Sequence, residues 1–339
     1  MENNSPMKKQ GDICIIGAGP AGINAAVYLA EYGLRSIVID EAPKAGGAVY
    51  RGPFRDHAAA GHLGKKLKIE MDNLQRLLAR HAANIEMLTE TRVVGFMDNP
   101  QRLMVHKDDR GLFALHYKKL IICSGCYERT VPFPGWTLPG IMMLGALQSQ
   151  VKNSLVKPDK SVILVGTGPL LLVTAKQLHR IGVKVLGIYE SGARPQLAKQ
   201  FPTLIKNLPL VAQGFGYMLF LKKAGIDIHY GWSVMEARGK ESLDEVVVAP
   251  LDRDRRPILK KSRTIRVNTL GVGFGFISRS CLAKLLGVQM ARSEENGLFP
   301  RLTCGVGHPC PAFTPQGMWR AHMALTWRRL REKSRLWRC

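Results

Sequence analysis

The sequence has 339 residues and a hydrophobic fraction of 46%, which is enough to bury a large core and predicts two domains. Lys and Arg exceed Asp and Glu by 49 to 26, and the resulting charge of +23 attracts anions of any kind. No aromatic-interleaved basic motif or helix-turn-helix pattern accompanies this charge, which argues against a nucleic-acid-binding protein. Gly and Pro interrupt every long apolar run and the seven Cys are scattered, so we expect a cytoplasmic protein with no membrane segment and no disulfide framework.

Residues 12–41 follow the order of a nucleotide-binding unit. Residues 13–16 form a short apolar run, typical of a strand buried on both faces, and this run stops at a GxGxxG turn over 17–22. A helix over residues 23–32 would aim its N-terminal N–H groups at bound phosphates, and a second strand is expected at 37–39. This order predicts a dinucleotide or another ADP-containing ligand, against the alternative of an α/β turn that binds nothing.

The residues of this first turn have separate expected roles. Gly17 makes the tight turn, Gly19 lets a pyrophosphate approach the backbone, and Gly22 lets the helix pack closely on the strand. Asp40 or Glu41, at the end of the second strand, can accept hydrogen bonds from an adenosine ribose.

The segment after the first unit contains a glycine-rich loop, a helix and several strands. In the loop at 42–52, Gly46 and Gly47 would let the backbone lie against a flat ring or a phosphate; the alternative is an ordinary loop. Leucines at helical spacing predict a core-facing helix with a basic outer face over 63–82. Short strands in a small antiparallel layer, then one more apolar strand, are expected at 85–96, 103–106, 112–117 and 119–123.

A second nucleotide-fold unit follows a change of domain. The proline-rich segment 131–140 is too rigid for helix or strand and marks the crossing, after which a helix is predicted over 141–152. Strand, turn, helix and strand are then expected at 162–165, 166–171, 172–181 and 183–189.

The second turn lacks one glycine. Gly166 and Gly168 are present, but Leu171 stands where close packing requires Gly, so we expect the helix to sit farther from the strand and the phosphate pocket to be altered. Glu190 could hold a ribose, and no Arg pair follows it to favour a 2′-phosphate. The sequence predicts that the fold is kept and leaves nicotinamide binding open.

The remaining segments lead the chain back into the first domain. Residues 193–225 are predicted to form a helical insertion that is broken at Pro202 and Pro209. Beyond it we expect strands and one short helix, at 226–249, 263–267, 269–276 and 281–286 respectively.

The order of these pieces resembles the two-dinucleotide-fold flavoprotein reductases, in which a nicotinamide domain is inserted into an FAD domain. Among them, the sequence resembles the α subunits of heteromeric amine-oxidising flavoenzymes: those of opine oxidase and of hydroxyproline and proline dehydrogenases, and a hydrogen cyanide synthase subunit. The likeness covers residues 12–300. The strings that carry it are GGAVYRGP at 46–53, YERTVPFPGWTLPG at 127–140, VGTGPLLL at 165–172 and VGFGFISRSCLAKLLG at 272–287.

This resemblance implies an α/β fold of the glutathione-reductase-like type, with an FAD-type domain at 1–130 and 269–300 and an inserted nicotinamide-type domain at 131–268. It implies FAD or another adenine nucleotide at the first site, while NAD(P) at the second stays open. The implied substrate is a small amine. The implied partner is a β flavoprotein subunit, which would carry the amine-oxidising flavin, so we name no catalytic residue. The candidate cofactor-binding residues are Gly17, Gly19, Pro20, Ala21, Gly22, Asp40, Glu41, Gly46, Gly47, Arg51, Val93, Ser124, Gly125, Gly166 and Gly168.

Two other patterns could carry chemistry. Residues 123–126 read Cys-Ser-Gly-Cys, which could be a redox pair or half of a metal site, but no second CxxC is present and we expect a packing role. The nine His show no metal-ligand spacing, so we predict no metal site.

The first hypothesis for function is an electron-transfer or nucleotide-binding subunit of a flavin-dependent amine dehydrogenase or oxidase. Its substrates would be opine, hydroxyproline or proline-like amines. One alternative is a self-contained NAD(P)H-dependent flavin reductase. The other is an inactive, truncated nucleotide-binding remnant.

The C-terminal segment departs from the family pattern, which would continue with Pro-Gly-Val-Tyr-Ala-Ala-Gly-Asp and a flavin-binding acid. Residues 301–339 instead hold eight Lys and Arg against one acid, a charge of 8 − 1 = +7. When residues 311–320 are back-translated with GC-rich codons and read two bases later, they give Gly-Val-Tyr-Ala-Ala-Gly-Asp-Val-Ala. We therefore expect an aberrant basic tail, frameshifted near Arg301 and truncated. Sequencing of the gene tests this, because a gene without the family reading frame downstream would contradict it.

Overall fold

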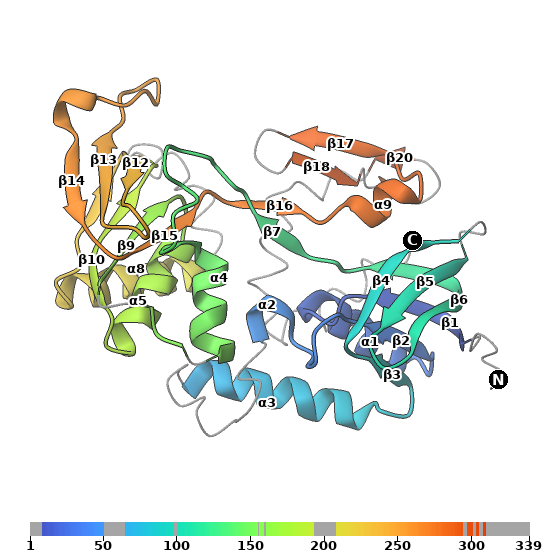
Figure 1. Ribbon diagram of the computed structural model, residues 1–339. Helices are drawn as coiled ribbons and strands as arrows, with labels where there is room; N and C mark the ends of the chain where they lie inside the picture. The colour runs from blue at the N-terminus through green and yellow to red at the C-terminus, as the bar shows by residue number, and fades with distance from the viewer. Residues whose placement is uncertain are drawn as a thin grey trace. The chain divides into compact units, whose positions relative to one another are not determined.

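The computed structural model divides the chain into two compact units, which are described separately (Figure 1). The first unit comprises residues 1–51, 66–127 and 277–339, and the second comprises 52–65 and 128–276. The structure describes residues 9–50, 65–97, 101–154, 156–158, 161–192, 208–293, 297–300, 303–304 and 308–309. The domain boundaries expected from the sequence stay predictions.

The first unit is built on a six-stranded sheet with the order β3-β2-β1-β6-β5-β4. β1 lies between β2 and β6 and is parallel to both, so the carboxyl ends of these three strands meet at one edge. The strands are β1 (Lys9–Ile16), β2 (Ser36–Ile39), β3 (Ile85–Leu88), β4 (Thr91–Phe96), β5 (Arg102–Lys107) and β6 (Gly111–Ile122).

Strand β6 corrects the prediction of separate strands at 112–117 and 119–123 in an independent antiparallel layer. It is one continuous strand whose first half pairs antiparallel with β5 and whose second half pairs parallel with β1. β3 is parallel to β2. Because these pairings join all six strands, β4 and β5 extend the nucleotide-fold sheet and do not form a layer of their own.

Both faces of this sheet are covered, as the continuous apolar run at 13–16 predicts. Ile15 faces the core cluster formed with helices α1 (Pro20–Glu31) and α3 (Lys65–Arg80). Cys14 and Ile16 face the opposite cluster, which includes residues of β5 and β6. Burial raises the pKa of the Cys14 thiol to about 12, so this thiol stays protonated beside the turn.

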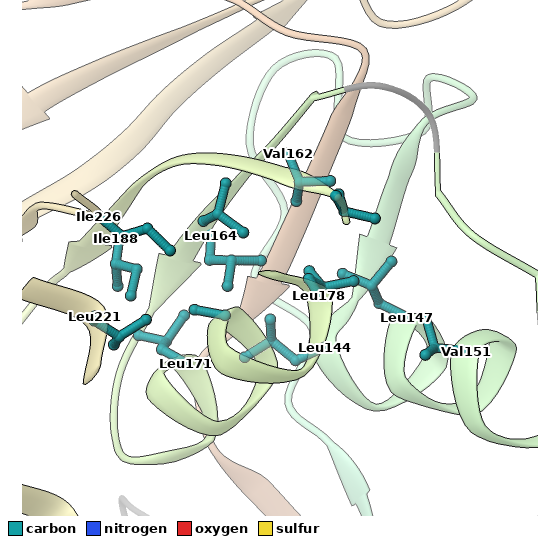
Figure 2. Packing of buried hydrophobic residues seen from close by; sticks show 13 residues of the cluster. Leu144, Leu147, Val151, Val162, Leu164, Leu171, Leu178, Ile188, Leu221 and Ile226 are labelled. Atoms are coloured by element: carbon teal, nitrogen blue, oxygen red, sulfur yellow. The ribbon is translucent and has the colours of Figure 1, made fainter. Parts of the chain in front are cut away.

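The second unit has a parallel five-stranded sheet, β11-β10-β9-β15-β8. Its helices α4 (Leu144–Ser149), α5 (Leu170–Arg180) and α8 (Leu208–Lys223) contribute to one core cluster (Figure 2). A three-stranded antiparallel sheet covers the other cluster. The strands are β8 (Ile141–Met143), β9 (Ser161–Gly166), β10 (Lys184–Glu190), β11 (Ile228–Tyr230), β12 (Trp232–Arg238), β13 (Glu245–Pro250), β14 (Arg263–Arg266) and β15 (Thr269–Gly273).

Two predicted helices differ from those observed in this unit. The segment predicted as a helix over 141–152 begins as strand β8, continues as α4 and ends in a π-helix, Gln150–Ser154. Pro209 does not break α8, because it lies in the first helical turn, where its missing N–H is not needed. Pro202 lies outside the described residues.

The chain leaves and re-enters the first unit through strands β7 (Cys126–Glu128) and β16 (Phe276–Ser278), which pair with each other. The N–H of Arg279 donates to the carbonyl of Gly125, and the N–H of Arg129 donates to that of Gly275. The remaining short elements are α2 (Gly47–Tyr50), a 3-10 turn (Leu259–Lys261), α9 (Cys281–Leu285), β17 (Met290–Ser293), β18 (Gly297–Pro300), β19 (Thr303–Cys304) and β20 (His308–Pro309). Within the described part of the chain, no helix is long and apolar enough to cross a membrane.

The start of α4 is held by a carboxylate from the crossing strand β7. The N–H of Gly145 donates to Glu128 Oε2 at 2.7 Å, and the N–H groups of Leu144 and Ala146 also bond to this carboxylate. These are the N–H groups that a helix start leaves without partners, and no side chain of the described residues caps the helix locally. Burial nevertheless raises the pKa of Glu128, and the three N–H groups only partly oppose this.

Glu128→Gln is expected to flatten the dependence of stability on pH. Because the folded-state pKa is raised, folding favours the protonated form. The contribution of Glu128 is therefore largest below its ordinary value of 4.5 and falls as the pH rises through the raised pKa. Urea unfolding at several pH values from acid to neutral should show the variant gaining on the wild type as pH rises. Glu241→Gln, at an exposed position, should show no such gain. A stability difference that is constant with pH for Glu128→Gln would contradict the prediction.

Candidate dinucleotide-binding site

The first glycine turn lies where strands β1, β2 and β6 end. The N–H of Gly17 donates to Ile39 O at 2.7 Å, and the N–H of Cys123 donates to Ile16 O at 2.7 Å. Gly17 has φ +103°, and a Cβ there would overlap the carbonyl oxygen of Cys123. The turn is therefore fitted so closely between strand ends that only glycine can occupy this position.

The next residues of the turn are equally close to other backbone. A Cβ on Gly22 would overlap Gly17 O, so α1 packs directly on the turn. A Cβ on Gly47 would lie 2.8 Å from the Cα of Gly19, and the N–H of Gly46 donates to Ala18 O at 2.8 Å. The loop thus lies against the turn, as expected for Gly46 and Gly47.

The start of α1 presents backbone N–H groups without a local cap. Gly19 is the N-cap residue, Pro20 and Ala21 form the first helical positions, and no side chain of the described residues caps this end. Pro20 has no N–H to satisfy and is suited to the position. An uncapped helix start beside a glycine-rich turn is a ready site for a phosphate.

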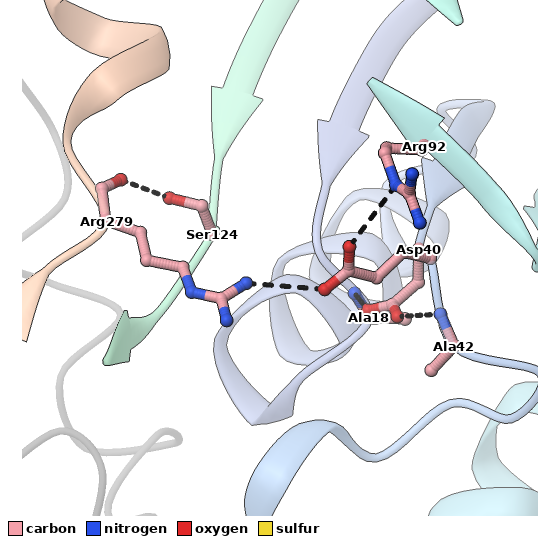
Figure 3. Close-up of polar contacts among 7 residues, drawn as sticks. Ala18, Asp40, Ala42, Arg92, Ser124 and Arg279 are labelled. Carbon is pink, nitrogen blue, oxygen red and sulfur yellow. Dashed lines mark hydrogen bonds and ion pairs between the residues drawn. The ribbon is translucent and has the colours of Figure 1, made fainter. Parts of the chain in front are cut away.

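Asp40 holds the turn through both of its carboxylate oxygens (Figure 3). Oδ2 accepts the N–H of Ala18 at 2.6 Å, and Oδ1 accepts the N–H of Ala42 at 2.8 Å. A carboxylate has about four lone-pair positions, so Asp40 keeps acceptor capacity for a ribose hydroxyl. The residue chosen for ribose binding therefore also fixes the shape of the phosphate turn.

Glu41 is surrounded by two arginines that the sequence analysis did not name. Its carboxylate lies 3.4 Å from Arg279 Nη1 and 3.9 Å from Arg92 Nε (Figure 3). All three side chains are more than half exposed, so each pair contributes at most about 1 kcal/mol. Arg279 is also fixed by its backbone, because the Ser124 hydroxyl donates to its carbonyl at 2.7 Å.

Ser124 and Gly125 are thus brought to the same strand edge as Asp40, together with Arg279. Arg279 lies inside the 272–287 string that carries the resemblance, and that string is the signal that could have identified it. Val93 instead packs at the margin of the core cluster under β4 and β5. Arg51 and residues 310–339 of the tail lie outside the described residues.

The second glycine turn repeats this arrangement. The N–H groups of Gly168 and Gly192 donate to Glu190 Oε2 and Oε1, each at 3.0 Å. The acid follows the turn N–H by 22 residues in both units. Burial raises the pKa of Glu190, and the two N–H groups oppose the rise. A Cβ on Gly166 would overlap Gly273 O, whereas a Cβ on Gly168 would meet no atom within 4 Å.

Leu171 makes the second turn different from the first. It is fully buried, and it packs in the cluster that contains Leu164, Ile188 and Leu221 (Figure 2). At the equivalent position of the first turn, the backbone of Gly22 approaches the Gly17 carbonyl too closely for any side chain. The second unit therefore fills with a side chain the layer that the first unit closes with backbone.

The cysteines of the CxxC segment are not bonded to each other. Cys123 and Cys126 are free thiols; Cys126 is exposed, and burial raises the pKa of Cys123. Within the described ranges, no group of three or more His, Cys, Asp or Glu side chains is placed to hold a metal ion.

Residues 11–298 match the model of the family described as pyridine nucleotide-disulphide oxidoreductase. The chain belongs to this family. Membership indicates a protein that binds FAD, NAD(P) or both. It also agrees with the two glycine turns, each followed at the same distance by an acid.

Curated members of the family are similar to most of the chain. Hydrogen cyanide synthase subunit HcnB of Pseudomonas protegens is 42% identical over 284 residues, 84% of this chain and 60% of the relative. An opine oxidase subunit of Rhizobium meliloti is 32% identical over 296 residues, 85% and 61% respectively. The chain thus spans about three fifths of the length of these relatives. The expected likeness to subunits of this type is confirmed.

Solved structures agree with this family at the level of the fold. Thioredoxin reductase of T. acidophilum has a TM-score of 0.59 and 19% identity, over 85% of this chain and 83% of that one. L-proline dehydrogenase of P. horikoshii has a TM-score of 0.58 and 18% identity, over 91% and 51%. The predicted α/β architecture with two dinucleotide-binding domains is confirmed.

The two turns should respond in opposite ways to the same residue type. Gly22→Ala overpacks the first turn and should destabilise by about 1–3 kcal/mol. Leu171→Ala leaves a cavity in the second core and should cost about 2–5 kcal/mol. Urea unfolding measures both.

Gly216→Ala is the matched control for these two variants. This glycine lies in α8 with open space around its Cα, so alanine should be neutral or should stabilise the helix by up to about 1 kcal/mol. A neutral Gly22→Ala would contradict the close packing described for the first turn.

Proposed function

We propose that this chain is the nucleotide-binding, electron-transfer subunit of a heteromeric flavin-dependent amine dehydrogenase or oxidase. The observation that carries the proposal is the 42% identity to a hydrogen cyanide synthase subunit, together with 32% identity to an opine oxidase subunit. The proposed substrates are opine, hydroxyproline or proline-like amines. The reaction would take a hydride from the carbon beside the amine nitrogen and leave an imine. Scattered free cysteines favour a cytoplasmic location.

FAD is the cofactor we propose for the first site. The fit rests on the backbone cradle at Gly17, Gly19 and Gly22, where a side chain would overlap or crowd neighbouring backbone, and on the uncapped start of α1. These residues would hold the pyrophosphate, and Asp40 would hold the adenosine ribose. When bound, the flavin supplies the hydride-accepting chemistry, while the chain orients it and excludes water.

For the second site we propose an adenine nucleotide. Gly166, Gly168 and Glu190 keep the turn and its acid, which supports a ribose and a phosphate. These features also support a second candidate function, an NAD(P)H-dependent flavin reductase complete in one chain. We further propose that the catalytic flavin of the amine reaction lies on a partner subunit, so no residue of this chain is assigned to the amine.

The proposal is tested by co-purifying the chain with the flavoprotein subunit encoded beside it, then recording the visible spectrum and identifying the extracted nucleotides. We expect flavin and an adenine nucleotide, and amine-dependent bleaching of the flavin by the complex. Asp40→Asn should lower the nucleotide content of this chain, because an amide cannot accept two N–H bonds through two oxygens. Asp12→Asn, which loses only a surface pair with Lys118, should not.

Other results would select the alternatives. Flavin reduction by NAD(P)H in the isolated chain, with no response to amines in the complex, would favour the flavin reductase. A colourless chain that neither binds nucleotide nor melts cooperatively would favour an inactive remnant.

A further inference from the structure

Helix α8 has an apolar face that none of the described residues covers. Phe215, Met218 and Leu219 follow helical i, i+3, i+4 spacing and are 67%, 42% and 45% exposed. Leu221, on another side of the same helix, is fully buried in the core of the second unit. A helix that is apolar on all sides is normally buried on all sides, so this face is built to be covered.

The border of this face is basic. Lys176 Nζ lies 4.8 Å from the ring centre of Tyr217 and 4.9 Å from that of Phe220, and the Arg180 guanidinium lies 5.8 Å from Phe220. Lys222 and Lys223 end α8 and are exposed. Neither α5 nor α8 contains an Asp or Glu.

The basic side chains on this border lack nearby compensation. The pKa of Lys176 is lowered, first by burial and then by the positive charge of Arg180. A surface that brings carboxylates to this border would relieve that repulsion.

We propose that Phe215, Met218 and Leu219, with their basic border, form the α8 face that docks the partner subunit, through an apolar patch ringed by carboxylates. This inference rests on the proposed function, which supplies the partner. Charge decides between the partner and a second copy of the chain. A two-fold dimer would place the same patch on itself and bring one lysine border against the other.

Binding of the flavoprotein subunit encoded beside this chain tests the proposal. Dissociation constants are measured by titration calorimetry for the wild type, for Phe215→Gln with Met218→Gln, and for Lys222→Glu with Lys223→Glu. The apolar pair should weaken binding about 30-fold, as loss of central interface anchors does. The charge pair should weaken it about tenfold at low salt and less at high salt.

Matched controls come from the same unit. Leu259→Gln changes a side chain that is 63% exposed on the 3-10 turn, and Lys240→Glu changes an exposed lysine outside the α8 face. Both should leave the affinity unchanged. All variants alter exposed positions, so their melting temperatures should match the wild type, which separates lost docking from lost folding.

Three results would overturn the inference. If the wild type forms the complex and the Phe215/Met218 variant binds equally well, the α8 face is wrong and the proposed function stands. If the wild type forms no complex, the proposed partner fails and the face fails with it. If sedimentation shows that the wild type self-associates and that the Phe215/Met218 variant does not, the face belongs to a second copy of this chain.

Discussion

A carboxylate that accepts backbone N–H groups from a glycine-rich turn is the interaction on which both units depend. The turn must place strand end, helix start and loop within contact of one another, and it has few side chains with which to do so. Asp40 in the first unit and Glu190 in the second supply the missing bonds from the end of the neighbouring strand. Each acid ties the turn to the following loop and so fixes where a phosphate can approach.

The first turn could be predicted closely because each of its constraints leaves a mark on a single residue. Gly17 and Gly22 are required by carbonyl oxygens that leave no room for a Cβ, and Asp40 is required at a fixed strand end. Local chemistry of this kind is visible in a short window of sequence. The same holds for α3, whose buried Met71 and Leu74 follow the expected helical spacing.

Features that depend on distant partners could not be predicted in this way. β8 has only three residues, too few for any period, and it is a strand because β15 pairs with it. β6 changes from an antiparallel to a parallel neighbour along its length, so its composition changes and suggests two strands. Arg279 reaches Glu41 across 238 positions of sequence, and no local pattern encodes that approach.

The paired crossing strands have a consequence for how such a chain can diversify. The second unit leaves and returns through neighbouring strands, pinned by backbone bonds between Gly125 and Arg279 and between Arg129 and Gly275. The entropy of closing a long loop grows only slowly with its length, so the first unit tolerates a large insertion at this point. The inserted unit can then change its own ligand turn, as Leu171 does, while the ends that join it to the first unit keep their spacing. The ribbon of β7 and β16 acts as a standard socket, into which one nucleotide fold is fitted without retuning the other.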